Sequence, residues 1–385
     1  MKMAAEVVSV PRDTGNPYTP SGLLLAPGAM IPGPMKAVIL AGGEGTRLRP
    51  LTLGTPKPVV PVVDRPLLQH QLDLLASIGV NEVVFSIAYK PEQVQRAFGD
   101  GTGVGCRIVY AVEETPLGTG GAVRNAAPHL DRRTLVLNGD VLTDVDLGAV
   151  VELHERSRAA ATIVLAPVPN PAAFGLVETD ATGRVRRFVE KPDPSQITTD
   201  TINAGIYILE TSALDLIPSG VNHSIERGFF PSLISRGDCV MAHVHTGYWI
   251  DVGTPEKYLQ VHRDILGRRL SVDLAGESRD GGHVHPSARI DAAARLEGPF
   301  YVGPRCRVAA DATVGPFSVL VADATLAPGA RTADSVVWAG ASLGENATVE
   351  GALLGSGVRV GRHAVVGPGA CLGEGTVVSD HSRTH

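Results

Sequence analysis

The chain has 385 residues, and its 40 acidic against 34 basic side chains give a formal net charge of −6. A mildly acidic chain offers no broad basic surface for a nucleic-acid backbone, so a dedicated DNA- or RNA-binding protein is not expected. With 44% hydrophobic and 19% charged residues, the chain can bury apolar cores and carries too little charge for general disorder. Its length predicts about two domains.

Cysteine usage and the proline-rich start of the chain bear on its cellular compartment. The cysteines are Cys106, Cys239, Cys306 and Cys371. Their spacing contains no C-x-x-C pair, which argues against a zinc site or a disulfide framework and favours the cytoplasm. Residues 1–34 contain no apolar stretch near the ~20 residues of a membrane span, so neither a signal peptide nor a membrane partner is expected. We expect this segment to be a flexible extension.

From Lys36 onward, β-rich runs alternate with helical ones. Strands are expected at 36–41, 81–88, 107–112 and 134–140, and helices at 65–79, 91–98 and 121–127. In the first helix Leu68, Leu72 and Leu75 form an apolar stripe, and Pro66 stands where a first-turn proline would. This pattern predicts βαβ units in an α/β, Rossmann-like domain over residues 35–268, with a mixed, mostly parallel sheet. Ligands are expected at the carboxyl ends of the strands.

The last third of the chain has a period of six residues. Aliphatic residues recur at Val284, Ile290, Leu296, Val302, Val308, Val314, Leu320 and Leu326, then at Val337, Leu343 and Val349, and then at Leu354, Val360, Val366, Leu372 and Val378. This hexapeptide repeat is typical of parallel β-helices, whose aliphatic corners stack inward. We therefore expect a left-handed parallel β-helix over residues 283–380, with the domain boundary in the polar stretch 271–282.

A glycine-rich loop with fixed positive charge follows the first predicted strand. Gly42, Gly43 and Gly45 leave room for backbone N–H groups to surround phosphate oxygens, and Arg47 and Lys57 add positive charge. The loop matches neither a Walker A motif nor a dinucleotide-binding fingerprint. A tight strand-to-helix turn is the structural alternative, but the arginine and the proline-flanked lysine favour a phosphate site.

Two aspartates are candidate metal ligands. Asp140 follows the run TLVLN and would project from the carboxyl end of a strand, and Asp251 ends a second run of aromatic and apolar residues. Two carboxylates with an open coordination sphere suit Mg²⁺, which prefers oxygen ligands and bridges phosphates. The alternatives are a turn-capping role for Asp140 and a plain surface charge for Asp251.

Several motifs occur in an order and spacing that resemble one family, the sugar-nucleotide pyrophosphorylases, which are NTP:sugar-1-phosphate nucleotidyltransferases. The motifs are GEGTRLRPLT (43–52), PKP (56–58), PLGTGGAV (116–123), LNGD (137–140), AFGLV (173–177), FVEKP (188–192), INAGIYIL (202–209) and GYWIDVGTPEKY (247–258). The resemblance covers essentially residues 35–268 and implies a nucleotidyltransferase domain there.

The resemblance also implies which residues bind and react. Nucleotide contacts are expected from Leu40, Ala41, Gly42, Gly43, Gly45, Thr46, Gly118 and Thr119. Sugar-phosphate contacts are expected from Gly175, Glu190, Lys191 and Asn203. The catalytic groups are expected to be Arg47, Lys57, Asp140, Lys191 and Asp251, with Mg²⁺ held by Asp140 and Asp251 as the cofactor.

The implied reaction joins a hexose-1-phosphate to an NTP and releases pyrophosphate. Within the family, the mannose-1-phosphate guanylyltransferases are most similar, through PLGTGG, SIERGFFPSLI (224–234) and the hexapeptide region, so GTP and mannose-1-phosphate are the expected substrates. A glucose-1-phosphate thymidylyl- or uridylyltransferase is one alternative, and a non-catalytic regulatory paralogue is another. Acyl transfer by a histidine such as His363 is less expected. The β-helix is expected to assemble a homo-oligomer.

Overall fold

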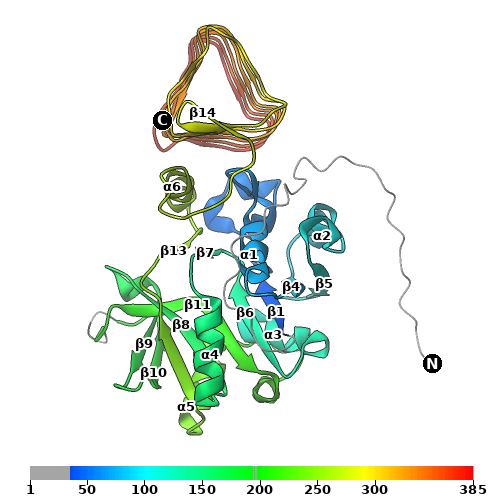
Figure 1. Cartoon of the computed structure of the whole chain (residues 1–385), viewed down its shortest axis with the longest axis vertical. Helices are drawn as coiled ribbons and strands as arrows, with labels where there is room; N and C mark the ends of the chain where they lie inside the picture. Colours follow the sequence, from blue (N-terminus) through cyan, green and yellow to red (C-terminus); the bar gives the residue numbers. More distant parts are fainter. Residues whose placement is uncertain (1–34, 194, 196, 385) are drawn as a thin grey trace, which may run out of the picture.

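The computed structural model describes residues 35–193, 195 and 197–384, so the extension expected at residues 1–34 lies outside the described part of the chain. Figure 1 shows two regions. The first combines helices and a sheet, and the second is a stack of short strands that appears as a triangle when viewed along its axis.

A mixed sheet of nine strands forms the core of the first region within the described residues. Its strands are β1 (Lys36–Leu40), β4 (Glu82–Ile87), β5 (Arg107–Val112), β6 (Arg133–Asn138), β8 (Ala161–Pro167), β9 (Gly175–Thr179), β10 (Val185–Glu190), β11 (Thr201–Glu210) and β12 (Val240–Val244). The main path runs β10-β9-β11-β6-β1-β4-β5, with β8 between β11 and β12. β1, β4, β5 and β6 pair in parallel, as βαβ units require.

The other half of the sheet is largely antiparallel. β11 is antiparallel to β6, β8 and β9, and β9 is antiparallel to β10. The expectation of a mixed sheet is confirmed, and its antiparallel part is larger than the sequence indicated. The physical reason is that loops and short turns, rather than crossover helices, connect β8, β9, β10 and β11.

Six α-helices occur in the described part of this region. They are α1 (Leu67–Ala76), α2 (Pro91–Phe98), α3 (Gly118–Ala126), α4 (Leu147–Ser157), α5 (Phe230–Ser235) and α6 (Pro255–Leu266). Leu68, Leu72 and Leu75 of α1 are buried, as their spacing predicted. Pro66 is the N-cap residue of α1, one position before the expected first-turn place. α3 begins at Gly118, earlier than predicted, so the glycine-rich run forms its N-terminal turn.

Two short ribbons lie outside the main sheet. β2 (Pro61–Val62) pairs with β3 (Arg65–Pro66), and β7 (Val141–Thr143) pairs with β13 (Trp249–Asp251). In the second ribbon Asp251 stands opposite Val141, which directly follows Asp140 in the chain. This ribbon therefore brings together two segments that lie far apart in the sequence.

The second region is a parallel β-helix built from three sheets (Figure 1). The first sheet holds β14 (Glu277–Arg279), β15 (Gly282–Val284), β18 (Phe300–Val302), β21 (Ser318–Leu320), β24 (Val336–Val337), β27 (Leu353–Leu354) and β30 (Cys371–Leu372). The second holds β16 (Arg289–Ile290), β19 (Arg307–Val308), β22 (Thr325–Leu326), β25 (Ser342–Leu343), β28 (Arg359–Val360) and β31 (Val377–Val378). The third holds β17 (Arg295–Leu296), β20 (Thr313–Val314), β23 (Arg331–Ala333), β26 (Thr348–Glu350), β29 (Val365–Val366) and β32 (Arg383–Thr384).

The aliphatic corners predicted from the hexapeptide repeat all fall within these strands. Corner residues such as Val314, Leu326 and Val349 are fully buried inside the coil. The gap after Leu326 is filled by Thr332, a buried polar residue on β23. The period of six therefore continues for one more step than the aliphatic residues indicate, and the shorter step comes between Thr332 and Val337.

The first sheet of the β-helix packs against the first region through a shared apolar core. On the β-helix side this core includes Tyr301, Val319, Val336, Trp338 and Leu353. On the other side it includes Leu48, Leu51, Tyr258, Val261 and Ile265. Strands of the other two sheets carry residues such as Arg307 and Thr313 at the matching outward positions. Because burial of apolar surface stabilises a contact, the composition of the first sheet explains why it faces the first region.

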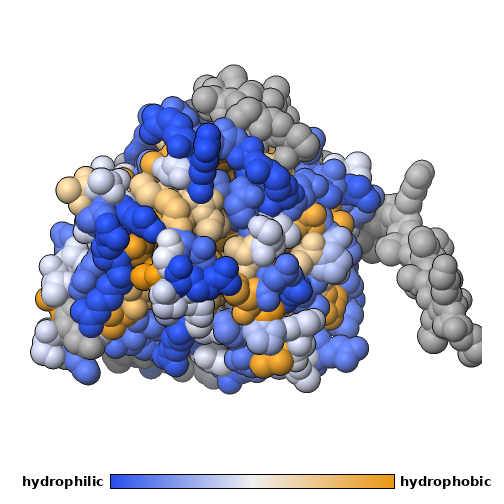
Figure 2. All heavy atoms as spheres, turned by 90° about the horizontal axis from the view of Figure 1, so that it is seen from below, coloured by the Kyte–Doolittle hydropathy of each residue, from blue (hydrophilic) through white to orange (hydrophobic). Residues whose placement is uncertain are grey.

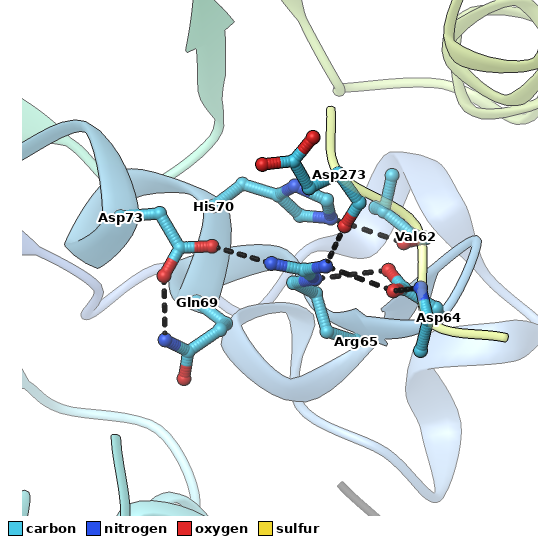
Figure 3. Close-up of polar contacts among 8 residues, drawn as sticks. Val62, Asp64, Arg65, Gln69, His70, Asp73 and Asp273 are labelled. Atoms are coloured by element: carbon cyan, nitrogen blue, oxygen red, sulfur yellow. Dashed lines mark hydrogen bonds and ion pairs between the residues drawn. The ribbon is translucent and has the colours of Figure 1, made fainter. Parts of the chain in front are cut away.

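A partly buried ion network holds the stretch between the two regions (Figure 3). The guanidinium of Arg65 bonds Asp64 at 2.8 Å and Asp73 at 2.7 Å, and it also contacts the carbonyl of Asp273. The amide of Ala275 donates to Asp64 at 2.8 Å. The polar stretch that follows α6 is thus fixed to β2 and β3 rather than acting as a free linker.

The outer surface is predominantly polar where Figure 2 displays it. Charged and polar residues cover most of the face seen there, and the apolar patches are small and separated. No helix among the described residues is long and apolar enough to cross a membrane.

Candidate active site

The loop after β1 lies beside the loop after β6 at the carboxyl edge of the sheet. The amide of Gly139 donates to the carbonyl of Leu40 at 2.9 Å, and the amide of Ala41 donates to the carbonyl of Ser86 at 2.8 Å. Gly45 has a φ of 64°, and its carbonyl accepts a hydrogen bond from the Thr52 hydroxyl at 2.8 Å. The glycine-rich loop is therefore held together by a hydrogen bond between its own residues, and it lies at the carboxyl ends of β1 and β6.

Lys57, which follows the glycine-rich loop, contacts a residue at the carboxyl end of β6. The Lys57 ammonium lies 2.9 Å from Oδ2 of Asp140, and only 11% of the lysine side chain is exposed. A short helical turn, Lys57–Val59, holds the lysine in this position. The structure therefore brings together Lys57 and Asp140, which the sequence analysis had assigned to one site from separate motifs.

The β7–β13 ribbon places the two predicted metal ligands side by side. Asp251 is the last residue of β13, and the amide of Val252 donates to the carbonyl of Asp140 at 2.7 Å. The Asp251 carboxylate contacts the ammonium of Lys257, a residue of α6. The Asp140 and Asp251 carboxylates, on adjacent backbone segments, thus each contact one lysine.

Arg47 belongs to the same cluster. A Cβ atom added at Gly253 would lie 2.7 Å from Nη2 of Arg47, so the guanidinium packs directly against the backbone of the turn that follows Asp251. Thr46, next to Arg47, is in the same short helical turn, Thr46–Leu48. Lys57 and Lys257 therefore contact the two aspartates, and Arg47 adds positive charge at the turn that follows Asp251.

The donor set of this cluster fits Mg²⁺. Among the described residues, no group of three or more His, Cys, Asp or Glu side chains could hold a metal ion together. Asp140 and Asp251 lie on adjacent backbone segments, and their carboxylates are oxygen donors of the kind that Mg²⁺ prefers. Mg²⁺ is typically bound by one or two carboxylates plus substrate phosphates.

The residues predicted for the sugar phosphate occupy neighbouring strands. Gly175 pairs with Glu190 across β9 and β10, and a Cβ atom at Gly175 would lie 2.6 Å from Oε2 of Glu190. The amide of Lys191 donates to the carbonyl of Phe174 at 3.1 Å, and the lysine side chain is exposed. Burial, with a smaller contribution from the Glu226 carboxylate, raises the pKa of Glu190.

Asn203 lies at an irregularity of β11, where the pairing with β8 shifts register. Its Nδ2 donates to the Tyr207 hydroxyl at 2.7 Å, and its Oδ1 accepts from the amide of Gly205 at 3.0 Å. Gly205 has a φ of 75°, which a side chain would disfavour. The local backbone thus fixes the orientation of the Asn203 amide.

Gly118 and Thr119 contact the chain's own segment 222–226. A Cβ atom at Gly118 would lie 2.8 Å from the carbonyl of His223, and the Thr119 hydroxyl donates to Glu226 at 2.7 Å. The amide of Ile225 donates back to the Thr119 hydroxyl at 2.9 Å. Close packing against His223 is therefore sufficient to explain a glycine at position 118. A nucleobase contact at Gly118 and Thr119 stays a prediction.

Sequence reasoning missed Lys257 and Glu113. Glu113 is buried beneath the glycine-rich loop, accepting a hydrogen bond from the Ser86 hydroxyl and another from the amide of Leu117, each at 2.9 Å. Lys257 lies in the first turn of α6, three positions after the N-cap residue Thr254. Its short distance in sequence from Asp251 is the signal that could have indicated a contact between the two side chains. Trp249 packs on Phe174, with ring centroids 5.6 Å apart.

His363, the histidine considered for acyl transfer, is exposed on the surface of the β-helix. His283 lies on β15 in the first coil, whereas His363 follows β28 near the other end and stacks on His381 with ring centroids 5.0 Å apart. The geometry of the β-helix therefore gives no support to that alternative.

The fold and this cluster define a nucleotidyltransferase. Residues 36–268 match the family described as nucleotidyl transferase, and residues 296–384 match the family described as GMPPB C-terminal domain. The chain belongs to the nucleotidyl transferase family.

Individual proteins that are similar to this chain include curated enzymes and a solved structure. A mannose-1-phosphate guanylyltransferase of Mycobacterium tuberculosis is 43% identical over 270 residues, which cover 69% of this chain and 74% of the relative. A probable mannose-1-phosphate guanylyltransferase of Arabidopsis thaliana is 36% identical over 358 residues, which cover 90% of this chain and 93% of the relative. A UTP–glucose-1-phosphate uridylyltransferase of Synechocystis is 32% identical over 339 residues, covering 79% of this chain and 87% of the relative. The crystal structure of HddC from Yersinia pseudotuberculosis superposes with a TM-score of 0.52 at 30% identity, over 59% of this chain and 97% of HddC.

Proposed function

We propose that the protein makes GDP-mannose and pyrophosphate from GTP and mannose-1-phosphate. The observation that carries the reaction class is that the β7–β13 ribbon sets Asp251 opposite Val141, the residue after Asp140, while Lys57 lies 2.9 Å from Asp140. The choice of guanine and mannose rests on the 43% identical relative, which exceeds the 32% identity to the uridylyltransferase. A glucose-1-phosphate uridylyl- or thymidylyltransferase is therefore the less favoured function.

In the proposed reaction, a phosphate oxygen of mannose-1-phosphate attacks the α-phosphorus of GTP in line. One phosphorus–oxygen bond forms, the bond to the β-phosphate breaks, and pyrophosphate leaves. No protein nucleophile takes part, so the chain acts by positioning and by neutralising charge. Arg47 and Lys57 face the triphosphate, whose backbone contacts come from the loop of Gly42, Gly43 and Gly45.

Asp140 and Asp251 would hold Mg²⁺, which supplies neutralising charge to the phosphates when it is bound. Lys191, exposed at the end of β10, would bind the sugar phosphate as a point charge. Glu190 would accept hydrogen bonds from the hexose hydroxyls, Asn203 would exchange hydrogen bonds with them, and Gly175 would offer its backbone to the sugar.

We further propose residues 35–268 as the catalytic domain and residues 283–380 as the β-helix domain. α6 ends at Leu266 and the first β-helix strand of the parallel stack, β15, begins at Gly282, in line with this division. We place the reaction in the cytoplasm, in agreement with the free state of the cysteines in the described residues. A homo-oligomer assembled through the outward faces of the β-helix is proposed, and light scattering of the full chain tests it. A monomer mass would contradict it.

The experiment that tests the function is pyrophosphate release from a grid of substrates. GTP, dTTP, UTP, CTP and ATP are each combined with mannose-1-phosphate and with glucose-1-phosphate, in Mg²⁺ and in EDTA. We expect the strongest signal from GTP with mannose-1-phosphate, and its loss in EDTA. A preference for UTP or dTTP with glucose-1-phosphate would move the function to the alternative, and no release in any combination would favour a regulatory paralogue.

A further inference from the structure

A second lysine–carboxylate pair stands beside the first in the candidate active site. The Lys257 ammonium contacts Oδ1 of Asp251, just as the Lys57 ammonium contacts Oδ2 of Asp140. The Asp251 side chain is 15% exposed and the Lys257 side chain is 37% exposed, so the pair is partly shielded from water. An ion pair in such a setting is screened less than one on the open surface.

The position of Lys257 is fixed by the start of α6. Thr254 caps this helix, accepting a hydrogen bond from the amide of Lys257 at 3.4 Å. The next residue, Tyr258, is fully buried, and its hydroxyl accepts a hydrogen bond from the indole nitrogen of Trp338 at 2.9 Å. Lys257 therefore projects from an anchored turn, and its contact with Asp251 follows from the fold.

The other neighbour of Lys257 belongs to the predicted sugar-phosphate side. Its ammonium lies 5.2 Å from the centre of the Phe174 ring, within the range of a cation–π contact. The carbonyl of Phe174 accepts the backbone hydrogen bond of Lys191. Lys257 thus stands between the aspartate assigned to the metal and the segment that holds the lysine assigned to the sugar phosphate.

The charges in this arrangement have a direct chemical consequence. A carboxylate oxygen that carries an ammonium cannot offer the same lone pairs to a divalent cation, and two positive charges near one carboxylate repel each other. A divalent cation that binds Oδ1 of Asp251 therefore displaces Lys257, and one that binds Oδ2 is still repelled by the ammonium beside it. The displaced ammonium remains next to Phe174, where a phosphate oxygen is the natural new partner for a point charge.

We propose that Lys257 is the counter-ion of Asp251 in the substrate-free protein and becomes a binding group for a substrate phosphate once a divalent cation occupies Asp251. This inference rests on the proposed function, because it takes Asp251 as a metal ligand. It assigns Lys257 two partners in sequence, a carboxylate and then a phosphate, and so links metal binding to sugar-phosphate binding.

The first test is the affinity of the full-length, substrate-free protein for Mn²⁺, measured from the electron paramagnetic resonance signal of free Mn²⁺. Lys257→Met removes the competing ammonium, so its Kd for Mn²⁺ is expected to fall by about three- to tenfold, the worth of a partly exposed ion pair. Lys36→Met is the matched control, since it removes the same charge from a lysine paired with Glu82 and Asp131 at the start of β1. Its Kd should equal that of the wild type.

The second test is the binding of mannose-1-phosphate, measured by calorimetry in saturating Mn²⁺. Lys257→Met is expected to weaken this binding by about tenfold, and Lys257→Arg, which keeps a positive charge, is expected to restore much of it. Opposite effects of one substitution on metal and on sugar phosphate distinguish the proposed exchange from general damage to the fold, which would weaken both.

Mn²⁺ binding by Asp251→Asn distinguishes a failure of the Lys257 proposal from a failure of the metal assignment. If Asp251→Asn weakens Mn²⁺ binding while Lys257→Met leaves both affinities unchanged, the proposal for Lys257 is wrong and the metal assignment stands. If Asp251→Asn binds Mn²⁺ like the wild type, the metal assignment is wrong, and with it the inference for Lys257. The substrate grid described above tests the proposed function independently of both results.

Discussion

The indole nitrogen of Trp338 donates a hydrogen bond to the hydroxyl of Tyr258 at a distance of 2.9 Å, and both side chains are buried. The same hydroxyl donates to the carbonyl of Pro61. One oxygen atom therefore joins the β-helix, the first turn of α6 and the segment that follows Lys57. The candidate active site and the β-helix share a structural support at this point.

Trp338→Phe should lower the free energy of unfolding by about 1–2 kcal/mol, because it keeps most of the ring and removes the buried donor. Tyr258→Phe should lower the free energy of unfolding by more than Trp338→Phe does, since it removes the hydroxyl that bonds both the Trp338 donor and the Pro61 acceptor. Urea unfolding measures both. In a double-mutant cycle, the hydrogen-bond part of the Trp338 effect should vanish in the Tyr258→Phe background. Strict additivity of the two substitutions would contradict the coupling.

Asp251→Asn should reduce kcat by roughly 10²- to 10³-fold, the usual effect of removing one preorganised charged group. Steady-state pyrophosphate release in saturating Mg²⁺ measures it. Asp291→Asn is the control, because Asp291 follows β16 on the exposed surface of the β-helix. A wild-type kcat in Asp251→Asn would show that this carboxylate does not hold the metal.

Lys191→Ala should mainly raise KM for mannose-1-phosphate, by about tenfold or more, because the lost charge binds the substrate without taking part in bond breaking. The dependence of the rate on mannose-1-phosphate at fixed GTP gives the two constants. Arg187→Ala is a suitable comparison, since Arg187 is an exposed residue of β10, the strand that ends just before Lys191, and its side chain pairs with Glu178 at 3.3 Å. Equal KM values for the two variants would remove Lys191 from the sugar-phosphate site.

Gly253→Ala should lower activity with little loss of stability. The new Cβ would meet the Arg47 guanidinium at 2.7 Å, and the far end of a flexible side chain can move at small energetic cost. Displacing Arg47 from the cluster should then reduce kcat by about tenfold or more. Gly103→Ala, where no atom lies within 4 Å of the added Cβ, serves as the control. Normal kinetics in Gly253→Ala would mean that the position of Arg47 is not critical.

Stability should decrease in mild acid because of His262. Burial lowers the pKa of this fully enclosed imidazole from 6.5 to about 4. Between these two values the unfolded chain binds the proton and the folded chain does not, so the free energy of unfolding falls as pH is lowered through this window, by up to about 3 kcal/mol. Denaturant midpoints between pH 7 and 5 should show the slope. It should be reduced in His262→Phe and kept in the surface variant His129→Gln, and an unchanged slope in His262→Phe would refute the assignment.

Much of the fold could be predicted from the sequence because the relevant signals are local. The strands that end at Leu40 and Asn138, the apolar stripe of α1 and the hexapeptide corners all follow from side-chain periodicity. Thr332 escaped the pattern because a polar residue occupies a corner that the coil normally gives to an aliphatic side chain. The antiparallel pairing of β8, β9 and β11 escaped it because strand direction depends on long-range contacts, which periodicity does not encode.

The candidate site was predictable in composition and much less so in geometry. The order of the motifs predicted that Lys57, Asp140 and Asp251 belong to one site. Their proximity, however, depends on the β7–β13 ribbon. Lys257 was missed because a lysine in the first turn of a helix is usually a solvated surface residue. Only the direction of α6 turns its ammonium toward Asp251.

The β7–β13 ribbon also bears on how the protein reaches its active state. Its two strands are separated in the chain by residues 144–248, which include β8, β9, β11 and α5. Contacts across so long a stretch carry a large entropic cost of closure and tend to form late in folding. The pair of aspartates would then be completed only after the intervening half of the sheet is in place. A partly folded chain could therefore show native secondary structure and remain catalytically silent, so the recovery of activity during refolding would time the closing of this ribbon.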